Sequence, residues 1–421
     1  MEKKKMSLVS RIMIGLGLGV AVGLLFISNP SIPGKFIQPF GTLFLNLVKM
    51  TIVPLVFASL VGGAASIGDI KKLGRVGGKT MIYFFVTTGF AVFIGLFVSN
   101  FLKPGIGITL ALSAPAAQQA AAEAPSLVQT LLNIVPTNPI DALAKGNMLQ
   151  IIFFAILSGI GATYVGEKGQ AYLKFCDSLA EIMYKLTEMI MSLAPYGVFA
   201  LMVPVIANNG PKVLLPLIKL IIACYLAYLI HVLITYSTTI KLWSKFSIAQ
   251  FLKGILPALA MAFSTSSGAA TLPLGMKISQ EEFGVSESIS SFVLPLGTTI
   301  NMDGTAIFQG ACAVFIAQVY GIDLSFSQQL TIILTATLAS IGTAGVPGSG
   351  FIMLTMVLAS VGLPIEGMAL IAGIERILDM GRTTVNVAGN LSASVVIAGT
   401  EGEIDYKNAG VIKGKTASEA V

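Results

Sequence analysis

The chain has 421 residues, of which 55% are hydrophobic and only 11% are charged, and its mean hydropathy is +0.86. Soluble domains carry about a quarter charged residues, so lipid must solvate most of this chain, and a soluble enzyme is excluded. The net charge of +6 does not indicate nucleic-acid binding, because Lys and Arg stand in short clusters between apolar runs, as in cytoplasmic loops of membrane proteins. The single histidine, His231, lies in apolar sequence and is interpreted as a packing residue.

Six apolar segments in the first 243 residues are long enough to cross the hydrocarbon core, which takes roughly 20 residues. They are Val9–Ile27, Phe36–Ser66, Met81–Leu102, Ser126–Tyr164, Tyr172–Asn208 and Val213–Trp243. Several exceed one crossing and must be tilted or bent, and Pro54 and Pro195 are places for a bend. Basic residues concentrate at the N-terminus, between residues 71 and 79 and in the tail. The positive-inside rule therefore predicts a multi-pass cell-membrane protein with both termini in the cytoplasm.

Two loop regions are also expected from composition. Residues Ala111–Ala124 are rich in Ala, Pro, Ser and Gln, which is typical of a flexible external connection. The tail after Glu401 is polar, and we expect it to be poorly ordered.

After Phe251 the apolar segments are interrupted by small and polar residues. Phe251–Lys277 contains Ser264–Gly268, and Phe326–Ser360 contains Ser340–Gly350. Each half is too short to cross alone, and non-helical backbone at membrane depth must be satisfied by protein, water or ligand. Two broken segments, each followed by a helix with polar residues, indicate a repeat of hairpin plus helix, which marks the binding site of a transporter. The alternative is two pairs of complete helices joined by ordinary loops.

The run Thr299–Thr305 places a carboxylate, Asp303, inside an apolar segment. Such a charge at bilayer depth costs several kcal/mol unless it is paired or binds a cation. Gly304 suggests local unwinding, which would turn backbone carbonyls toward an ion beside the oxygens of Asn301 and Asp303. This chemistry suits an alkali cation. A structural Asp303 that is hydrogen-bonded to a neighbouring helix is the alternative.

The last helix carries a polar stripe. At 100° per residue its members fall within about 120° of one another. They are Glu375, Asp379, Arg382, Thr383, Asn386 and Asn390. Arg382 could bind a substrate carboxylate with two hydrogen bonds, and Asp379 could pair with an ammonium group, which together match an acidic amino acid. An internal Asp379–Arg382 ion pair is the alternative. The N-termini of the short helices in both broken segments would favour the α-carboxylate.

Other functions fit these residues less well. Arg382 disfavours a neutral amino acid, and Asp379 disfavours a C4 dicarboxylate, because an unpaired buried charge would remain beside the ligand. A channel or anion conductance would need a continuous polar lining, whereas the polar residues converge on one place. An intramembrane enzyme is disfavoured because the chain has no HExxH motif, no polar GxSxG and no catalytic dyad.

Three motifs together resemble signatures of the dicarboxylate/amino acid:cation symporter family, which includes excitatory amino-acid transporters and archaeal aspartate transporters. They are Asn301-Met302-Asp303-Gly304-Thr305, the stretch from Ser340 to Gly350, and Asp379-Met380-Gly381-Arg382-Thr383 with Asn386. The resemblance covers nearly the whole chain. It implies an all-α polytopic membrane protein with eight transmembrane helices and two re-entrant helical hairpins in inverted repeats. It also implies a homotrimer and a secondary active symporter of aspartate or glutamate.

The resemblance further implies a fixed scaffold and a transport domain that moves like an elevator. The scaffold would comprise residues 1–80 (spans one and two) and 104–212 (spans four and five). The transport domain would comprise residues 81–103 (span three) and 213–400 (span six, hairpin 1, span seven, hairpin 2 and span eight). Residues 401–421 would form a cytoplasmic tail.

The site residues carried over from the family fall into two sets. The substrate would contact Ser266, Ser267, Gly268, Thr305, Gly345, Val346, Pro347, Gly350, Asp379, Arg382, Thr383 and Asn386. Sodium ions would be bound by Thr87, Thr88, Thr299, Asn301, Met302, Asp303, Ser340, Ile341, Thr343, Asn386 and Asn390.

The chain departs from the family pattern at several places. Asn390 stands where sodium-coupled relatives have Asp, and because proton-coupled bacterial relatives also have Asn there, protons are an alternative co-transported ion. Gly268 lacks the serine hydroxyl usual at the tip of hairpin 1. Neither that tip nor Met380 supplies the usual second arginine, for which Arg376 is a substitute.

Overall fold

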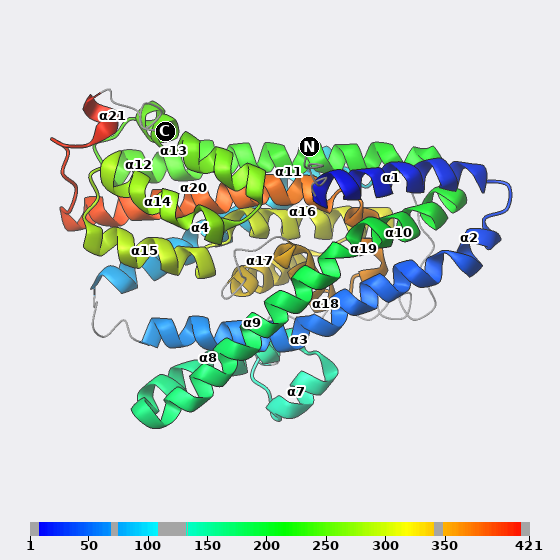
Figure 1. The fold of residues 1–421 in the computed structure, drawn as a ribbon, viewed down its shortest axis with the longest axis horizontal. Helices are drawn as coiled ribbons and strands as arrows, with labels where there is room; N and C mark the ends of the chain where they lie inside the picture. The colour runs from blue at the N-terminus through cyan, green and yellow to red at the C-terminus, as the bar shows by residue number, and fades with distance from the viewer. Residues whose placement is uncertain (1–7, 69–74, 108–131, 133, 341–347, 414–421) are drawn as a thin grey trace, which may run out of the picture.

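The structure, a computed structural model, describes residues 8–68, 75–107, 132, 134–340 and 348–413 (Figure 1). Over these ranges the regular secondary structure is helical, and the β-pairing is limited to one isolated bridge between Val285 and Ile404. The prediction of an all-α polytopic membrane protein is confirmed. The expected loop Ala111–Ala124 lies outside the described residues.

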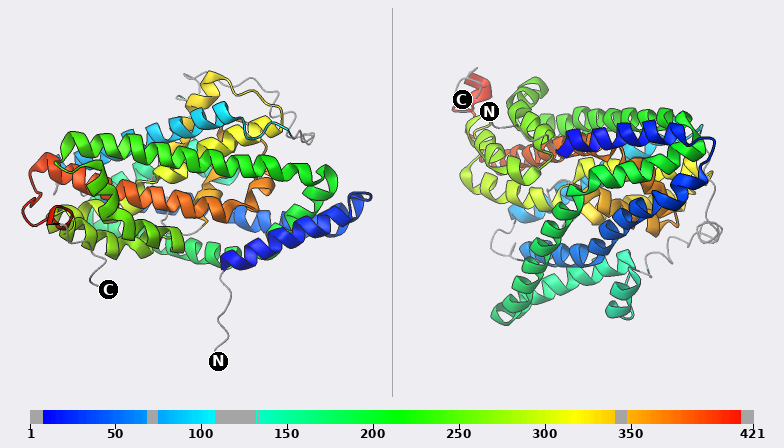
Figure 2. Two further views of the ribbon diagram at one scale, coloured as in Figure 1. Left: turned by 90° about the horizontal axis from the view of Figure 1, so that it is seen from above. Right: turned by 45° about the vertical axis from the view of Figure 1, so that its right-hand side comes forward.

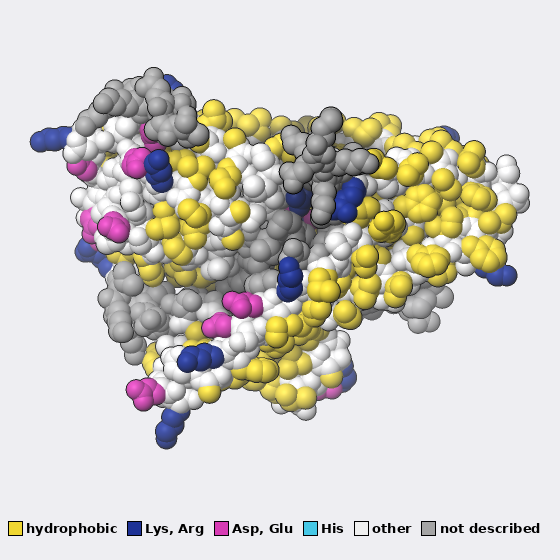
Figure 3. Space-filling view, in the orientation of Figure 1, with side chains coloured by type: hydrophobic (Ala, Val, Ile, Leu, Met, Phe, Trp, Pro, Cys, Tyr) yellow, Lys and Arg dark blue, Asp and Glu magenta, His cyan; other side chains and the backbone are white. Residues whose placement is uncertain are grey.

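Four helices are long and apolar enough to cross a bilayer in the described part of the chain. They are Arg75–Leu102 (α4), Pro211–Trp243, Ile248–Thr265 (α13) and Glu287–Val319. Large apolar side chains such as Phe97 and Leu226 lie exposed on them. In Figure 3 hydrophobic side chains cover much of the visible face, whereas most carboxylates lie toward the left-hand end. Such a surface requires lipid as its solvent.

The helices of the first group pack mainly on one another. They are α1 (Leu8–Leu25), α2 (Ser31–Phe36), α3 (Gln38–Gly68), α7 (Pro139–Lys145), α8 (Met148–Val165), α9 (Gln170–Ser192) and α10 (Ala194–Asn209). α1 runs along α10, and α3 packs against α8, α9 and α10. In Figure 1 α3, α8 and α9 form an inclined layer below α15, α17 and α20, with α7 beneath it.

The second group surrounds the last long helix. It comprises α4, α11 (Leu214–His231), η4 (Val232–Tyr236), α12 (Ser237–Trp243), α13, α14 (Gly268–Glu281), α15 (Glu287–Ile300), α16 (Asp303–Val319), α17 (Phe326–Ser340), α18 (Ser349–Ser360), α19 (Met368–Ala372) and α20 (Glu375–Glu401). α20 contacts α4 and every helix from α11 to α16. Figure 2 shows α11 and α20 side by side along the long axis. Because these neighbours enclose α20, its polar stripe does not face lipid.

Two predicted spans are interrupted. Ser126–Tyr164 is not one helix in its described part, because α7 ends at Gly146 in the left-handed conformation, with φ of 68°, before α8 begins. Tyr172–Asn208 is divided at Leu193 into α9 and α10. Pro195 lies in the first turn of α10, where its missing N–H costs no hydrogen bond. By contrast, α3 continues through Pro54.

The prediction of a poorly ordered tail is wrong as far as Lys413. Glu403 accepts hydrogen bonds from the hydroxyls of Ser286 and Ser288. The ring of Tyr406 lies 5.3 Å from that of Phe246, and a short helix, α21 (Gly410–Lys413), follows. These contacts hold the tail against the base of the α13–α14 pair, which composition alone does not reveal.

The two broken segments form helix pairs. α13 and α14 are joined by Ser266 and Ser267, and α17 and α18 are separated by residues 341–348. α14, α17 and α18 have 14, 15 and 12 residues, fewer than the roughly 20 that one crossing takes. α13 has 18 residues, so it is longer than expected for half of a hairpin.

Candidate functional site

The chain between α15 and α16 is unwound, as the sequence predicts. α15 ends at Ile300 and α16 begins at Asp303, with Asn301 in an extended conformation. The first free N–H groups of α16 are satisfied from α20, because the Oδ1 atom of Asn386 accepts from the N–H of Gly304 at 2.8 Å and of Thr305 at 3.4 Å. Any Cβ at Gly304 would collide with the carbonyl of Arg382. Only glycine therefore allows this approach of α16 to α20.

Asp303 is fully buried and accepts hydrogen bonds from three helices. The hydroxyl of Thr88 on α4 donates to Oδ1 at 2.6 Å. The hydroxyl of Tyr236 lies 2.8 Å and Nε2 of His231 lies 3.2 Å from Oδ2. His231 is thus buried, as expected, but it is also a polar partner of Asp303. These contacts agree with the alternative interpretation of the sequence, in which Asp303 is hydrogen-bonded to a neighbouring helix.

The π-helical turn η4 explains why His231 and Tyr236 meet at one carboxylate. In an α-helix, residues five apart point about 140° away from each other. A π-turn bonds residue i to i+5 and so brings them nearer to one face. No Pro or Gly marks this turn in Val232–Tyr236, and we find no sequence signal that would have identified it.

Asn301 extends the polar cluster toward the end of the stripe. Its Nδ2 donates to Oδ1 of Asn390 at 3.1 Å. Its own Oδ1 is buried and has no hydrogen-bond partner among the described residues. A buried acceptor without a donor is costly, and a cation at this place would satisfy it. Asn301 and Asn390 therefore fit a sodium ion. Oδ2 of Asp303 has two donors, whereas Oδ1 has one and keeps an acceptor position for a cation.

Four charged side chains of α20 form a buried cluster. Arg382 donates from Nε to Oδ1 of Asp379 at 2.8 Å and from Nη2 to Oε1 of Glu375 at 2.9 Å. Arg376 donates from Nη1 to Oδ2 of Asp379 at 3.0 Å. The internal Asp379–Arg382 ion pair is thus present, and Arg376, which was considered only as a substitute arginine, is its neighbour. We name Glu375, Arg376, Asp379 and Arg382 the charge quartet.

Arg382 retains a free hydrogen-bonding group. Its Nη1 is buried and lacks a partner in the part of the chain that is described. The guanidinium carbon also lies 4.9 Å from the centre of the Phe308 ring, a cation–π contact. The planar group is thereby held in one orientation, with a donor available for a ligand.

A narrow cavity of about 10 Å³ joins these groups, so the site is contracted in this structure. It is lined by Gly268, Thr298, Asn301, Met302, Thr305, Ser349, Asp379, Arg382, Thr383, Asn386 and Asn390. Gly268, Asp303 and Ser349 are the first residues of α14, α16 and α18, so three helix N-termini converge here. Their partial positive charge favours an anionic group in the cavity.

The tip between α13 and α14 supplies backbone and one hydroxyl. Ser266 adopts the left-handed conformation with φ of 51°, and its buried Oγ has no partner within the described ranges. The hydroxyl of Ser267 accepts from the N–H of Ala270 at 3.2 Å and caps α14. Ser267 is therefore used structurally, while Gly268 lines the cavity through its backbone.

Gly350 at the start of α18 packs closely against the site. A Cβ there would lie 2.8 Å from Cγ2 of Thr305 and 2.9 Å from Cζ of Arg382. Gly345, Val346, Pro347, Ile341 and Thr343 lie outside the described residues.

Five of the predicted cation ligands that the structure describes do not line the cavity. Thr88 and Asp303 are bonded to each other beside it, and the other three bond to carbonyls of their own helices. The Thr87 hydroxyl donates to the carbonyl of Phe84 at 3.3 Å, that of Thr299 to Leu296 at 2.9 Å, and that of Ser340 to Thr337 at 2.7 Å. Thr298, which the sequence analysis did not select, lines the cavity in place of Thr299.

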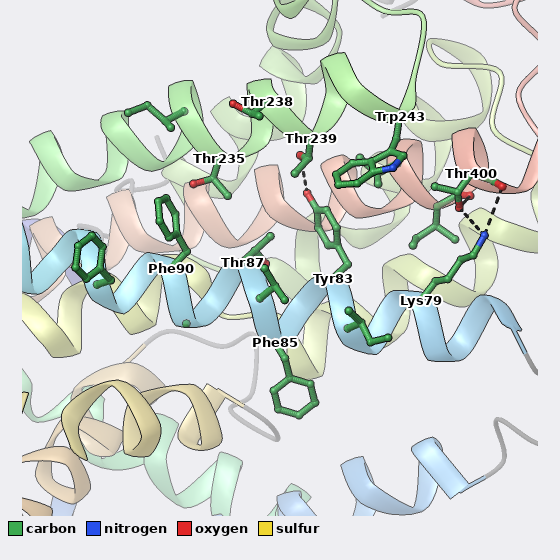
Figure 4. A pocket seen from close by; sticks show the side chains of 17 residues that line it. Lys79, Tyr83, Phe85, Thr87, Phe90, Thr235, Thr238, Thr239, Trp243 and Thr400 are labelled. Carbon is green, nitrogen blue, oxygen red and sulfur yellow. Dashed lines mark hydrogen bonds between the residues drawn. The ribbon is translucent and has the colours of Figure 1, made fainter. Parts of the chain in front are cut away.

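A larger hollow of about 820 Å³ lies elsewhere, between α4, α12 and the end of α20. Figure 4 shows Thr87, Phe90 and Trp243 along it and the Nζ atom of Lys79 bonded to Thr400 at its edge. Most of its lining is apolar, which suits hydrocarbon and not a charged amino acid. We therefore assign the polar cavity as the candidate substrate site.

Comparison with known proteins places this geometry in context. Residues 8–400 match the model of the sodium:dicarboxylate symporter family. A proton/sodium-glutamate symport protein of Geobacillus stearothermophilus is 42% identical over 406 residues, covering 95% of this chain and 96% of the relative. A proton/glutamate-aspartate symporter of Escherichia coli (strain K12) is 39% identical, covering 97% and 96%. A C4-dicarboxylate transport protein of Bacillus subtilis (strain 168) is 39% identical, covering 95% and 94%.

Proposed function

Since the chain belongs to the sodium:dicarboxylate symporter family and is a transporter rather than an enzyme, we propose that it takes up acidic amino acids. The observation that carries this proposal is the pairing of Arg382 with Asp379 at the wall of a polar cavity. The free Nη1 donor of Arg382 would bind the side-chain carboxylate of aspartate or glutamate. Asp379 would receive the substrate ammonium group.

The remaining polar groups suit the other end of such a substrate. The α-carboxylate would lie at the converging helix N-termini, near Gly268 and the unpaired hydroxyl of Ser266. Thr305, Thr383 and Asn386 would complete the hydrogen bonds around the backbone of the substrate.

Coupling to cations is supported by Oδ1 of Asn301, a buried acceptor without a donor among the described residues. We propose that sodium ions are co-transported and that Asn301, Asn390 and Asp303 belong to their binding sites. Asn390 carries no charge, so protons are the alternative co-transported ion. A bound cation would order the unwound segment Asn301–Met302 and so complete the substrate site, which makes binding of the two ligands reciprocal.

The contacts between helices support a division into a fixed part and a moving part. α4 packs on α11, α16 and α17 of the second group, although in sequence it lies between α3 and α7 of the first group. We propose that residues 81–103 and 213–400 form an elevator-like transport domain, that residues 1–80 and 104–212 form the scaffold, and that eight transmembrane helices with two re-entrant hairpins are present. We also propose a homotrimer in the cell membrane with both termini, including the tail 401–421, in the cytoplasm.

Uptake into proteoliposomes tests this function directly. Purified protein would be reconstituted, and sodium and pH gradients would be imposed separately while labelled aspartate and glutamate are measured. We expect uptake to be driven by one or both gradients and to fall at least about thirtyfold in Arg382→Ala, because truncating one partner of a buried charge pair costs 2–5 kcal/mol or more. Arg75→Gln, at an exposed ion pair with Glu401, serves as control. Unchanged glutamate uptake in Arg382→Ala would refute the substrate assignment.

A further inference from the structure

The carboxylate of Asp379 accepts three hydrogen bonds without any substrate and has a further close ion-pair contact. Oδ1 lies 2.8 Å from Nε and 2.7 Å from Nη2 of Arg382. Oδ2 lies 3.0 Å from Nη1 of Arg376 and 3.2 Å from the backbone N–H of Gly348. Three hydrogen bonds and two guanidinium groups within 3.0 Å nearly fill the roughly four acceptor positions of a carboxylate, so a substrate amine is not required to compensate the charge of Asp379.

Arg376 is the member of the charge quartet that balances the second carboxylate. Glu375 and Asp379 carry two negative charges, and Arg376 and Arg382 carry two positive charges, so the quartet is neutral. Arg382 contacts both carboxylates, whereas Arg376 forms its ion pair with Asp379. All four side chains are buried. Without Arg376 a net negative charge would remain beside the cavity in a medium of low polarity.

We infer that Arg376 is a specificity-determining residue: by serving as an internal counter-ion of Asp379, it allows the cavity to bind dicarboxylates that lack an amino group as well as acidic amino acids. This inference rests on the proposed function and reverses the expectation that Asp379 excludes C4 dicarboxylates. That expectation assumed an unpaired Asp379.

Succinate and aspartate show what Arg376 contributes, because succinate is aspartate without the amino group. Succinate brings two negative charges and no donor for Asp379, so its binding requires that Arg376 remain in place. Aspartate brings an ammonium group, which can take over the position of the Arg376 donor at Oδ2. The loss of Arg376 therefore weakens the binding of succinate strongly and the binding of aspartate little. A purely structural role would weaken both ligands in parallel.

The unused donors of the quartet support an anionic ligand of this kind. Nη1 of Arg382 and Nε of Arg376 are both buried, and neither has an acceptor among the residues that the structure describes. Of these two residues Arg382 lines the cavity, so its Nη1 donor leaves capacity there for a carboxylate of the ligand. Arg376 is not among the residues that line the cavity, which fits action through Asp379.

Equilibrium binding to the full-length purified protein tests the inference. Labelled L-aspartate would be displaced by unlabelled aspartate or succinate in a sodium-containing buffer, in the wild type, Arg376→Gln, Arg376→Lys and Arg75→Gln. We expect succinate to displace aspartate competitively in the wild type. In Arg376→Gln the ratio of the succinate to the aspartate dissociation constant should rise at least about tenfold. Arg376→Lys, which keeps the charge, and Arg75→Gln, which removes an arginine outside the site, should keep the wild-type ratio.

Asp379→Asn provides a second test if Arg376→Gln does not fold. Removing the charge that Arg376 neutralises should weaken the binding of aspartate and leave that of succinate nearly unchanged. The ratio of the succinate to the aspartate dissociation constant should therefore fall. The inference is overturned if aspartate binds to the wild type and succinate does not, or if the ratio stays constant in Arg376→Gln. Absence of binding of both aspartate and glutamate to the wild type overturns the proposed function itself, and with it this inference.

Discussion

Nε2 of His231 lies 3.2 Å from Oδ2 of Asp303, and both side chains are fully buried. Thr235, one turn further along, lies 3.1 Å from the other ring nitrogen of His231. If its hydroxyl donates to Nδ1, the ring donates from Nε2 to the carboxylate, which is the arrangement that a neutral histidine can adopt. Asp303 is thus oriented by side chains of α4, α11 and η4 while its backbone begins α16.

The Tyr236 hydroxyl should contribute measurably to stability through Asp303. Tyr236→Phe removes one donor at 2.8 Å from the buried carboxylate and leaves the ring in place. A hydrogen bond to a charged group contributes about 1.5–3 kcal/mol, so we expect a lower unfolding temperature in detergent. Tyr196→Phe, at a side chain that is 75% exposed, is the control. Equal unfolding temperatures of Tyr236→Phe and wild type would contradict the proposed importance of this contact.

Helical periodicity was sufficient to predict the composition of the stripe on α20. α20 is unbroken over Glu375–Glu401, so residues three, four and seven apart share a face, and the contact of Glu375 with Arg382 spans two turns. The unwinding at Asn301–Met302 was also predictable, because a buried carboxylate beside glycine fits poorly in an apolar helix.

The partners of Asp303 could not be predicted in the same way. Thr88 and Tyr236 are 215 and 67 residues distant from Asp303 in sequence, and only the packing of α4, α11 and η4 around α16 brings them to it. The π-turn brings the Tyr236 hydroxyl to Asp303, and the residue types in Val232–Tyr236 do not predict such a turn. From the sequence, Arg376 was expected only as a substitute for the arginine usual at the hairpin-1 tip or at position 380. In the structure it pairs with Asp379 because the two residues are three apart on the same helix.

Asp303 should be required for the dependence of substrate binding on cations. In Asp303→Asn the carboxylate charge is lost, while the amide can still bond to part of the surrounding hydroxyl groups. We expect the sodium concentration for half-maximal aspartate binding to rise at least about tenfold, because charge supplies much of the attraction for a cation in a buried site. Sodium titrations by isothermal calorimetry would measure this. Asp141→Asn makes the same change at an exposed ion pair with Lys145, and identical titrations for wild type and Asp303→Asn would remove Asp303 from the ion site.

A side chain at Gly350 should impair substrate binding without unfolding the protein. Gly350→Ala places a methyl group 2.8 Å from Thr305 and 2.9 Å from the guanidinium of Arg382. Contacts shorter than 3 Å cannot be kept, so α18 or Arg382 must move by several tenths of an ångström. We expect the dissociation constant of aspartate to rise about tenfold at a nearly unchanged unfolding temperature.

Gly161→Ala is the matched control for that substitution. Gly161 lies within α8, and an added Cβ meets no atom within 4 Å. Because alanine favours helix over glycine by up to about 1 kcal/mol, this variant should bind aspartate as the wild type does and be at least as stable. Equal affinity of Gly350→Ala and Gly161→Ala would show that α18 does not press on the site.

Asn390→Asp should make substrate binding more dependent on sodium. Asn390 accepts from Nδ2 of Asn301 and is 5% exposed, so a carboxylate there would be a buried charge beside the acceptor of Asn301 that lacks a donor. Such a charge is costly until a cation neutralises it. We therefore expect lower stability of Asn390→Asp without sodium, a larger increase in unfolding temperature on sodium addition, and a steeper sodium dependence of aspartate binding than in the wild type. Asn208→Asp, on α10 outside the site, is the control, and equal sodium-induced shifts in both variants would place the cation elsewhere than at Asn301 and Asn390.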